Sequence, residues 1–290
     1  MKQKENAELK RRSWTREVFG RLARNKVAMG ALIVVVVVVL ITMFSEQIAP
    51  YDYAKQDLTN LFSMPSAEHW CGTDNLGRDL FSRILVGGRI SLLVACAAIA
   101  IATVVGCTLG AIAGFFGGWT ETIIMKFLDI IMCVPQFLLA VTISAALGSG
   151  TFNTALAVGI SSVPRFARMM RAEIVSARGK DYVEAARACG SGNRRIIMKH
   201  MIPNCLSSTI VNVSLCLGGA ILAISGLSFV GLGVQPPTPE WGSILASGRA
   251  FMRDFWPIVI FPGIMIVIVM IAFNLLGDGL RDAMDPKLKY

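Results

Sequence analysis

Charged residues are scarce in this chain of 290 residues. Asp, Glu, Lys and Arg make up 16% of it, whereas soluble domains hold about a quarter. Hydrophobic residues account for 54%, and the mean hydropathy is +0.60. This composition excludes an ordinary soluble domain and indicates an integral membrane protein.

The sequence also lacks the residues of an enzyme active site. No GxxxxGK[ST] phosphate loop is present, because the single Gly-Lys pair, Gly179-Lys180, follows Ile174 where that motif requires glycine. The two histidines, His69 and His200, are not accompanied by paired carboxylates or by a Ser/His/Asp arrangement. We therefore expect no catalytic centre, no bound cofactor and no ATP hydrolysis on this chain.

Cysteines are few and scattered. The seven stand at positions 71, 96, 107, 133, 189, 205 and 216 and form no CxxC pair. Cys71 alone is expected on the oxidising side of a membrane, and it has no partner there. The pattern predicts small residues packed between helices, without a disulfide framework or a metal site.

Several apolar runs are long enough to cross a bilayer. They cover residues 27–44, 91–116, 123–147, 206–230 and 258–276. A further run, residues 152–170, is weaker because Ser161, Ser162, Pro164 and Arg165 interrupt it. Composition alone therefore leaves the crossing of this run open.

The distribution of positive charge decides whether the weaker run crosses. Residues 1–26 hold nine Lys and Arg against three acidic residues, residues 165–199 hold nine against three, and residues 47–89 hold four against five. Loops rich in Lys and Arg remain in the cytoplasm, so the first two segments belong on one side, separated by an even number of spans. The sequence predicts six spans with both termini cytoplasmic. This topology explains the net charge of +9 without a nucleic-acid partner.

A polar segment, residues 181–203, interrupts the apolar runs. Its first half is rich in helix-forming residues, Gly190 and Gly192 break the helix, and Asn193 is expected to cap a second, basic helix. Pro203 is expected to close the element before the next apolar run. Small side chains and basic charge suit a helix that seats in a groove, so we interpret the segment as a docking element for a soluble partner.

The same segment carries a known motif. Glu184-Ala185-Ala186, followed by Gly190 and by Pro203, resembles the EAA loop of ATP-binding-cassette (ABC) importer permeases. That family often has isoleucine where this chain has His200, and histidine is common there in the dipeptide and oligopeptide branch. The residues that the resemblance assigns to coupling with an ATPase subunit are Glu184, Ala185, Ala186, Gly190, Arg194, Arg195, His200 and Pro203. An ordinary amphipathic cytoplasmic loop is the alternative.

A second motif precedes the second apolar run. Residues 69–92, HWCGTDNLGRDLFSRILVGGRISL, resemble the GTDxxGRDxxSRxxxGxRxSL signature of dipeptide, oligopeptide and nickel permeases, the Opp/Dpp-type subfamily. Asp79 is expected to cap a helix that begins near Leu80. The signature residues expected at the outer mouth are Gly72, Thr73, Asp74, Gly77, Arg78, Asp79, Arg83 and Arg89. The arginines are expected either to ring this mouth or to pair with the aspartates in a loop that packs over the helices.

Two later segments extend the resemblance. Residues 226–242 are similar to the outer hairpin between spans five and six of this subfamily, and their closely spaced prolines exclude a continuous helix. Residues 273–287 are similar to its C-terminal signature. Because these motifs occur in order from about residue 49 to residue 287, the chain is identified as a member of the subfamily.

Glycine and proline recur within the apolar runs. Gly106, Gly110 and Gly114 lie four residues apart on one face of span two, and they predict a close helix–helix approach or a wall of the transport path. Pro135 and Pro164 are expected to kink spans three and four.

Charged side chains lie at the inner ends of spans three and four. Lys126 and Asp129 are three residues apart and are expected to pair as an interfacial anchor, with a proton relay as the alternative. Arg165, Arg168 and Arg171 form a stripe that we interpret first as a topology anchor and second as a docking surface.

The resemblance implies an all-α integral membrane protein with six transmembrane helices, the type I ABC importer permease fold, in a C-type subunit. Its implied partners are a homologous permease that completes a heterodimer, two cytoplasmic ATPase subunits that hold ATP and Mg²⁺, an extracytoplasmic substrate-binding protein and membrane lipid. The implied activity is alternating access in a bacterial inner membrane, with a dipeptide, a longer peptide, glutathione or a nickel complex as cargo.

The resemblance also implies a division of the chain. The expected parts are a cytoplasmic tail (1–26), a first transmembrane helix (27–46), an extracytoplasmic loop (47–88), a permease core (89–277) with its EAA loop at about 173–203, and a cytoplasmic tail (278–290). An ion-coupled secondary transporter and a membrane receptor that docks a signalling partner are the rival classes. Inverted repeats and midplane charges, which are typical of the first rival, are not evident.

Overall fold

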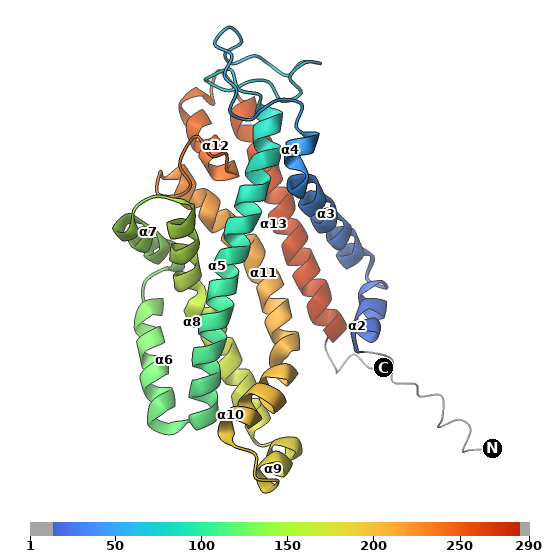
Figure 1. The fold of residues 1–290 in the computed structure, drawn as a ribbon, viewed down its shortest axis with the longest axis vertical. Helices are drawn as coiled ribbons and strands as arrows, with labels where there is room; N and C mark the ends of the chain where they lie inside the picture. Colours follow the sequence, from blue (N-terminus) through green and yellow to red (C-terminus); the bar gives the residue numbers. More distant parts are fainter. Residues whose placement is uncertain (1–13, 285–290) are drawn as a thin grey trace, which may run out of the picture.

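The computed structural model describes residues 14–284, and within that range the chain forms helices and no β-strand (Figure 1). The long helices are α3 (Lys26–Met43), α5 (Leu80–Phe116), α6 (Gly118–Met132), α7 (Gln136–Leu147), α8 (Thr151–Arg178), α11 (Ile202–Phe229) and α13 (Pro257–Met284). The short elements are α2 (Trp14–Leu22), α4 (Ser45–Ile48), α9 (Asp181–Ala188), α10 (Asn193–Arg195), the π-helical turn η1 (Ile196–Met201), α12 (Trp241–Gly248) and the 3₁₀ turn η2 (Arg249–Phe251). The expectation of an all-helical protein is confirmed for this part of the chain.

Length and apolar composition mark several elements as membrane spans. Helices α3, α5 and α13 qualify, as does the continuous helical stretch Asn193–Phe229 that contains α11. Helices α6 and α7 qualify together as one span that bends by 87°. Helix α8 does not meet the same criterion, so length and composition support four or five spans among the described residues.

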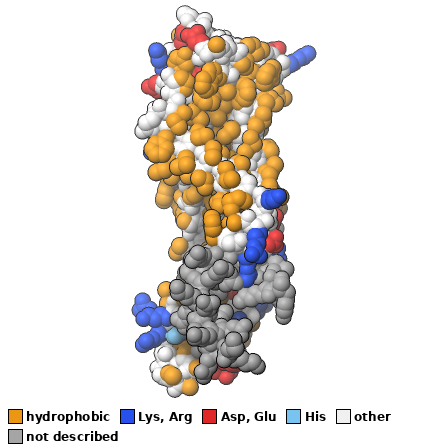
Figure 2. Space-filling model, turned by 90° about the vertical axis from the view of Figure 1, so that its right-hand side faces the viewer, with side chains coloured by type: hydrophobic (Ala, Val, Ile, Leu, Met, Phe, Trp, Pro, Cys, Tyr) orange, Lys and Arg blue, Asp and Glu red, His pale blue; other side chains and the backbone are white. Residues whose placement is uncertain are grey.

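The exposed surface of the bundle fits a lipid environment. Figure 2 shows hydrophobic side chains over the middle of one face, with charged groups towards its ends. Helix α3 contributes much of this apolar surface, for example through Val27 and Ile33, which are exposed. Continuous exposed apolar surface of this extent is typical of a membrane protein.

Helix α5 is the longest element and begins before its apolar run. The expected run starts at residue 91, whereas α5 starts at Leu80 because the side chain of Asp79 accepts a hydrogen bond from the backbone N–H of Ser82. Its 37 residues span about 55 Å, which exceeds the ~30 Å hydrocarbon core of a bilayer. The predicted cap at Asp79 is confirmed.

Helix α8 packs along α5 over most of its length. A Cβ added at Gly106 would lie 2.7 Å from the carbonyl oxygen of Val163, and one added at Gly110 would lie 2.2 Å from that of Ala167. Both distances are shorter than any ordinary contact, so the backbones approach closely only because these positions are glycine. The predicted close approach is confirmed, and α8 is identified as the partner helix.

The bend expected at Pro135 is confirmed, because α6 and α7 are separated there and meet at 87°, while Pro164 lies inside a continuous α8. The pairing expected for Asp129 needs correction. Asp129 does not pair with Lys126: its carboxylate accepts a hydrogen bond from Arg168, with Nη2 and Oδ1 2.5 Å apart. The Lys126–Asp129 interpretation was wrong because α8 brings a guanidinium to Asp129 from a neighbouring helix.

Candidate functional site

The predicted docking element forms a helical hairpin at one end of the bundle. Helix α9 ends in a turn in which the N–H of Gly190 donates to Arg187 O (2.9 Å) and the N–H of Ser191 donates to Ala186 O (3.0 Å). These are the two hydrogen bonds of a Schellman motif, which requires a left-handed residue at its centre. Gly190 supplies it with φ of +74°. The predicted turn at Gly190 is confirmed.

The second half of the element differs from the expectation. Asn193 is the first residue of α10 and makes no capping hydrogen bond, because Gly192 occupies the N-cap position. Helix α10 continues through the π turn η1 into α11, so Pro203 lies at the start of α11 and does not close the element. The π turn η1 lies just before Pro203, whose ring and missing N–H would disturb the hydrogen bonds of an α-helix. Proline is tolerated at this position because it lies near the start of α11.

The inner side of this hairpin is buried against two long helices. Val183, Ile196 and Met201 are fully buried, and they share a hydrophobic cluster with Phe115 of α5 and Ile174 of α8. This contact joins the hairpin to the ends of both helices. A displacement of the hairpin would therefore act directly on α5 and α8.

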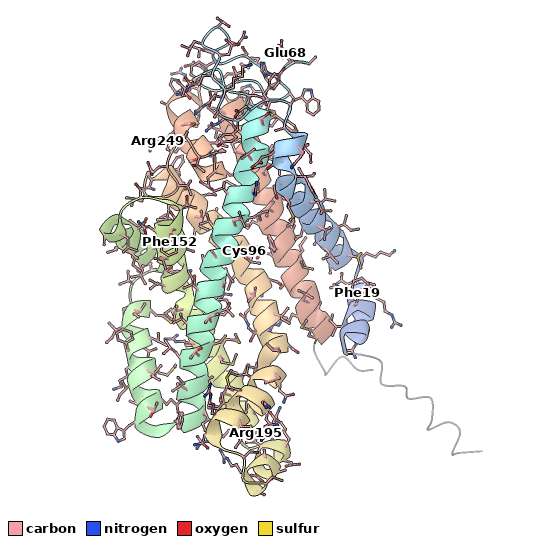
Figure 3. All side chains as sticks on the ribbon, in the orientation of Figure 1. Phe19, Glu68, Cys96, Phe152, Arg195 and Arg249 are labelled. Carbon is pink, nitrogen blue, oxygen red and sulfur yellow. The ribbon has the colours of Figure 1, made fainter. Side chains whose placement is uncertain are left out.

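The outer side of the hairpin is polar and accessible. Figure 3 shows Arg195 near one end of the molecule and Glu68 at the opposite end. The predicted coupling residues that are exposed are Glu184, Ala185, Gly190, Arg194, Arg195 and Pro203. His200 is partly buried, and Ala186 is buried beneath the hairpin. We define this set of exposed residues as the hairpin surface.

At the opposite end, the long loop before α5 is held by a buried ion cluster around Asp74. Its carboxylate accepts hydrogen bonds from the backbone N–H groups of Leu76 and Arg78, each at 2.9 Å, and from Arg78 Nε at 2.7 Å. Arg83 Nε lies 3.5 Å from the same carboxylate. Asp74, Arg78 and Arg83 are all buried, so these charges hold the loop against the helices.

The remaining signature residues have other partners. Asp79 accepts from Ser82 and also lies 2.9 Å from His69 Nδ1. Thr73 donates its hydroxyl hydrogen to Asn60 O, and Gly72 and Gly77 have φ of +81° and +71°. Arg89 is exposed and pairs with Glu46, with Nη1 and Oε1 2.8 Å apart. The expected pairing with an aspartate is therefore found for Arg78 and Arg83, which lie at Asp74, and it is wrong for Arg89, which pairs with Glu46 instead.

Cys71 lies inside this outer loop. Burial, and secondarily the charge of Asp79, raises the pKa of the Cys71 thiol to about 11. A thiol that stays protonated near neutral pH is a poor nucleophile and a poor metal ligand. Cys71 therefore acts as a packing residue in this loop.

Glu240 is a central residue to which sequence reasoning assigned no role. It is fully buried and caps α12, accepting hydrogen bonds from the N–H groups of Gly242 and Ser243. The same carboxylate accepts from Ser91 of α5 at 3.0 Å and from Ser225 of α11 at 3.3 Å. The signal available in the sequence was the serine three residues after Glu240, which completes a reciprocal capping arrangement.

The stripe of arginines on α8 divides into two groups. Arg168 pairs with Asp129, and Arg171 Nε donates to Glu121 Oε1 at 2.7 Å. Both bonds tie α8 to α6. Arg165 instead lines two cavities along α11, and within residues 14–284 it makes no ion pair or hydrogen bond.

A bundle of membrane-length helices with an exposed polar hairpin at one end fits a membrane protein that contacts a soluble partner. Comparison with protein families agrees. Residues 106–290 match the binding-protein-dependent transport system inner membrane component family, and residues 13–65 match the N-terminal TM domain of oligopeptide transport permease C. The chain therefore belongs to the family of binding-protein-dependent transport system inner membrane components. It is a membrane component of a transporter and not an enzyme.

Curated relatives cover nearly the whole chain. A dipeptide transport system permease protein of Alkalihalophilus pseudofirmus is 43% identical over 94% of this chain and 90% of its own length. A di/tripeptide transport system permease protein of Pseudomonas aeruginosa is 42% identical over 94% of this chain and 92% of its own length. A glutathione transport system permease protein of Escherichia coli is 42% identical over 94% and 90%. The resemblance to the Opp/Dpp-type permeases is confirmed.

Solved structures support the fold. A structure of the MetNI methionine ABC transporter in an inward-facing conformation has a TM-score of 0.57 and 16% identity, and the match covers 70% of this chain and 97% of that one. A structure of an amino acid ABC transporter has a TM-score of 0.53 and 14% identity, with 68% and 92% covered. At these identities the likeness concerns the fold alone.

Proposed function

We propose that this chain is the C-type permease subunit of an ATP-driven importer that carries di- or oligopeptides across a bacterial inner membrane. The alternative substrates within the same subfamily are glutathione and a nickel complex. The relatives are named as dipeptide, di/tripeptide and glutathione transport permeases, which supports a cargo of peptide character. ATP and Mg²⁺ belong to the partner ATPase subunits in this proposal.

The observation that carries the proposal is the two-sided hairpin α9–α10. Its buried side shares a hydrophobic cluster with α5 and α8, and its outer side exposes basic and small residues. An element built in this way can transmit movement from a soluble protein to the bundle. Coupling requires that the ATPase bind two conformations of the permease with different free energies, and the hairpin surface is where that difference would arise.

The proposal includes a complete assembly and an orientation. A homologous permease would complete a heterodimer, two ATPase subunits would bind the hairpin surfaces, and a substrate-binding protein would deliver cargo at the outer loop. The chain would cross the membrane six times, with α8 as the fourth span. Residues 1–26, 173–203 and 278–290 would face the cytoplasm, and residues 47–88 would face the outside.

Purification of the native complex tests this function against its rivals. We expect the chain to copurify with a second permease and an ATPase, and we expect the complex in proteoliposomes to take up dialanine only with loaded binding protein outside and ATP inside. Uptake that is driven by an ion gradient without ATP would indicate a secondary transporter. A complex without an ATPase and without uptake would indicate a receptor, and either result would overturn the proposal.

A further inference from the structure

Arg165 lies midway along α8, where two cavities meet. One cavity, of about 470 Å³, is lined by α7, α8 and α11, and the other, of about 480 Å³, is lined by α8, α11 and α13; both are open to the surface, and Arg165 is exposed in them. Arg165 and Leu215 line both. Each volume falls in the range of about 300–1,000 Å³ that is typical of small-molecule sites.

The charge of Arg165 is not neutralised by its surroundings in the described part of the chain. Its neighbours Arg168 and Arg171 point to α6 and are paired there with Asp129 and Glu121. The acid that lines the second cavity, Glu173, accepts a hydrogen bond from Ser208 of α11 at 2.7 Å and does not reach Arg165. A guanidinium in this position keeps its planar set of N–H donors available for a ligand.

The two cavities differ in character on either side of this guanidinium. The first is mostly apolar, with small residues of α11 such as Gly219, Ala223 and Gly226 beside two leucines of the same helix, and with Phe137 of α7. The second is lined by polar and charged groups, among them Ser207, Asn212 and a second guanidinium, that of Arg281. An apolar space beside a cation that is unpaired among the described residues suits a ligand with one constant anionic group and variable side chains.

We infer that Arg165 binds the C-terminal carboxylate of the peptide cargo as it passes through this permease, and the inference rests on the proposed peptide function. Arginine and a carboxylate form two parallel N–H···O bonds, so the guanidinium holds the one group that every unmodified peptide shares. The apolar cavity then accommodates side chains of different shape. Arg165 is thus a cargo-binding residue distinct from the hairpin surface that contacts the ATPase.

Uptake by the reconstituted importer tests this inference. Proteoliposomes holding the complete complex, with ATP inside and binding protein outside, are supplied with dialanine, whose single anionic group is its carboxylate. We expect Arg165→Gln to lower the initial rate of uptake at least tenfold and Arg165→Lys to restore part of it, because lysine keeps the charge without the two-pronged geometry. Arg253→Gln removes an exposed arginine outside both cavities and should leave uptake within twofold of wild type.

Two further readouts separate cargo binding from a structural role. ATP hydrolysis stimulated by loaded binding protein and the yield of the second permease should both stay within twofold of wild type in Arg165→Gln. Wild-type uptake by Arg165→Gln, equal defects in the Gln and Lys variants, or loss of the second permease from the purified complex would each overturn the inference. If the wild-type importer itself moves no peptide, the proposed function fails and the inference fails with it.

Discussion

At the scale of single residues, glycine sets the spacing between α5 and α8. The spacing of four residues placed Gly106 and Gly110 on one helix face in the sequence, because an α-helix repeats every 3.6 residues. The identity of the facing helix was not available from that pattern, since it depends on contacts between distant segments. The arginine stripe shows the same limit. Regular spacing placed Arg165 and Arg168 near each other on α8, but the packing of α6 against α8 gives Arg168 a partner and leaves Arg165 at the cavities.

Replacing Gly110 tests how much this approach contributes to stability. A side chain there would meet Ala167 O at 2.2 Å, so Gly110→Val must separate the two helices. We expect the free energy of unfolding to fall by about 1–3 kcal/mol, the usual cost of overpacking, or by more if the backbones cannot relax. The measurement is thermal unfolding of the purified importer in detergent.

Gly30→Val is the matched control, because no atom lies within 4 Å of a Cβ at that exposed position of α3. We expect it to unfold at the wild-type temperature. Equal losses of stability in the two variants would show that the loss comes from changing a helical glycine and not from the contact between α5 and α8.

At the scale of elements, both helical halves of the hairpin were predictable, whereas the cap at Asn193 and the end at Pro203 were wrong. Helix-forming residues and Gly190 indicated a helix and a turn, and both signals are local. The continuation through η1 into α11 was missed because Pro203 was taken as a stop signal, whereas the burial of Ile196 and Met201 beneath the hairpin favours an unbroken helix. Tertiary packing therefore overrode the local signal.

The turn at Gly190 provides a test of coupling. Gly190→Val places a β-branched residue at a φ of +74°, which costs about 1–3 kcal/mol and favours a rearranged hairpin. We expect the complex to insert and assemble normally, to hydrolyse ATP, and to transport cargo at least tenfold more slowly. The measurement is the ratio of molecules transported to ATP hydrolysed in proteoliposomes.

Gly192→Val is the control, two residues further along the same turn. A Cβ meets no atom within 4 Å at either glycine, but Gly192 has an extended backbone with φ of −67° that valine adopts freely. We expect Gly192→Val to keep more than half of the wild-type ratio of molecules transported to ATP hydrolysed. Normal coupling in Gly190→Val would show that the left-handed turn is not needed for transmission.

At the scale of the whole molecule, composition and motifs predicted a membrane transporter, and the shape of its interior was not predictable. The apolar runs indicated most spans because length and hydropathy are properties of a segment. The cavities at Arg165 arise between helices, where small residues of α11 leave space beside α7 and α8. Glu240 was passed over for a related reason, since its role becomes visible only when α5, α11 and α12 meet around it.

The crossing of α8 is the whole-molecule feature on which the orientation depends. This helix is too polar to qualify as a span by composition, yet it packs along α5, and its ion pairs are made with α6. Polar groups that face other helices or a cavity are tolerated at membrane depth because protein partners satisfy them. We therefore expect α8 to cross and to place its two ends on opposite sides of the membrane.

Cysteine labelling in the full-length chain checks this expectation. Three variants each carry a single cysteine: Ser66→Cys in the outer loop, Ser149→Cys before α8, and the native Cys189 after α8. All three positions are exposed. We expect a membrane-impermeant maleimide to label positions 66 and 149 in spheroplasts and to label Cys189 only after the membrane is opened. Labelling of 149 and 189 from the same side would mean that α8 does not cross, that five spans separate the termini, and that the two termini lie on opposite faces.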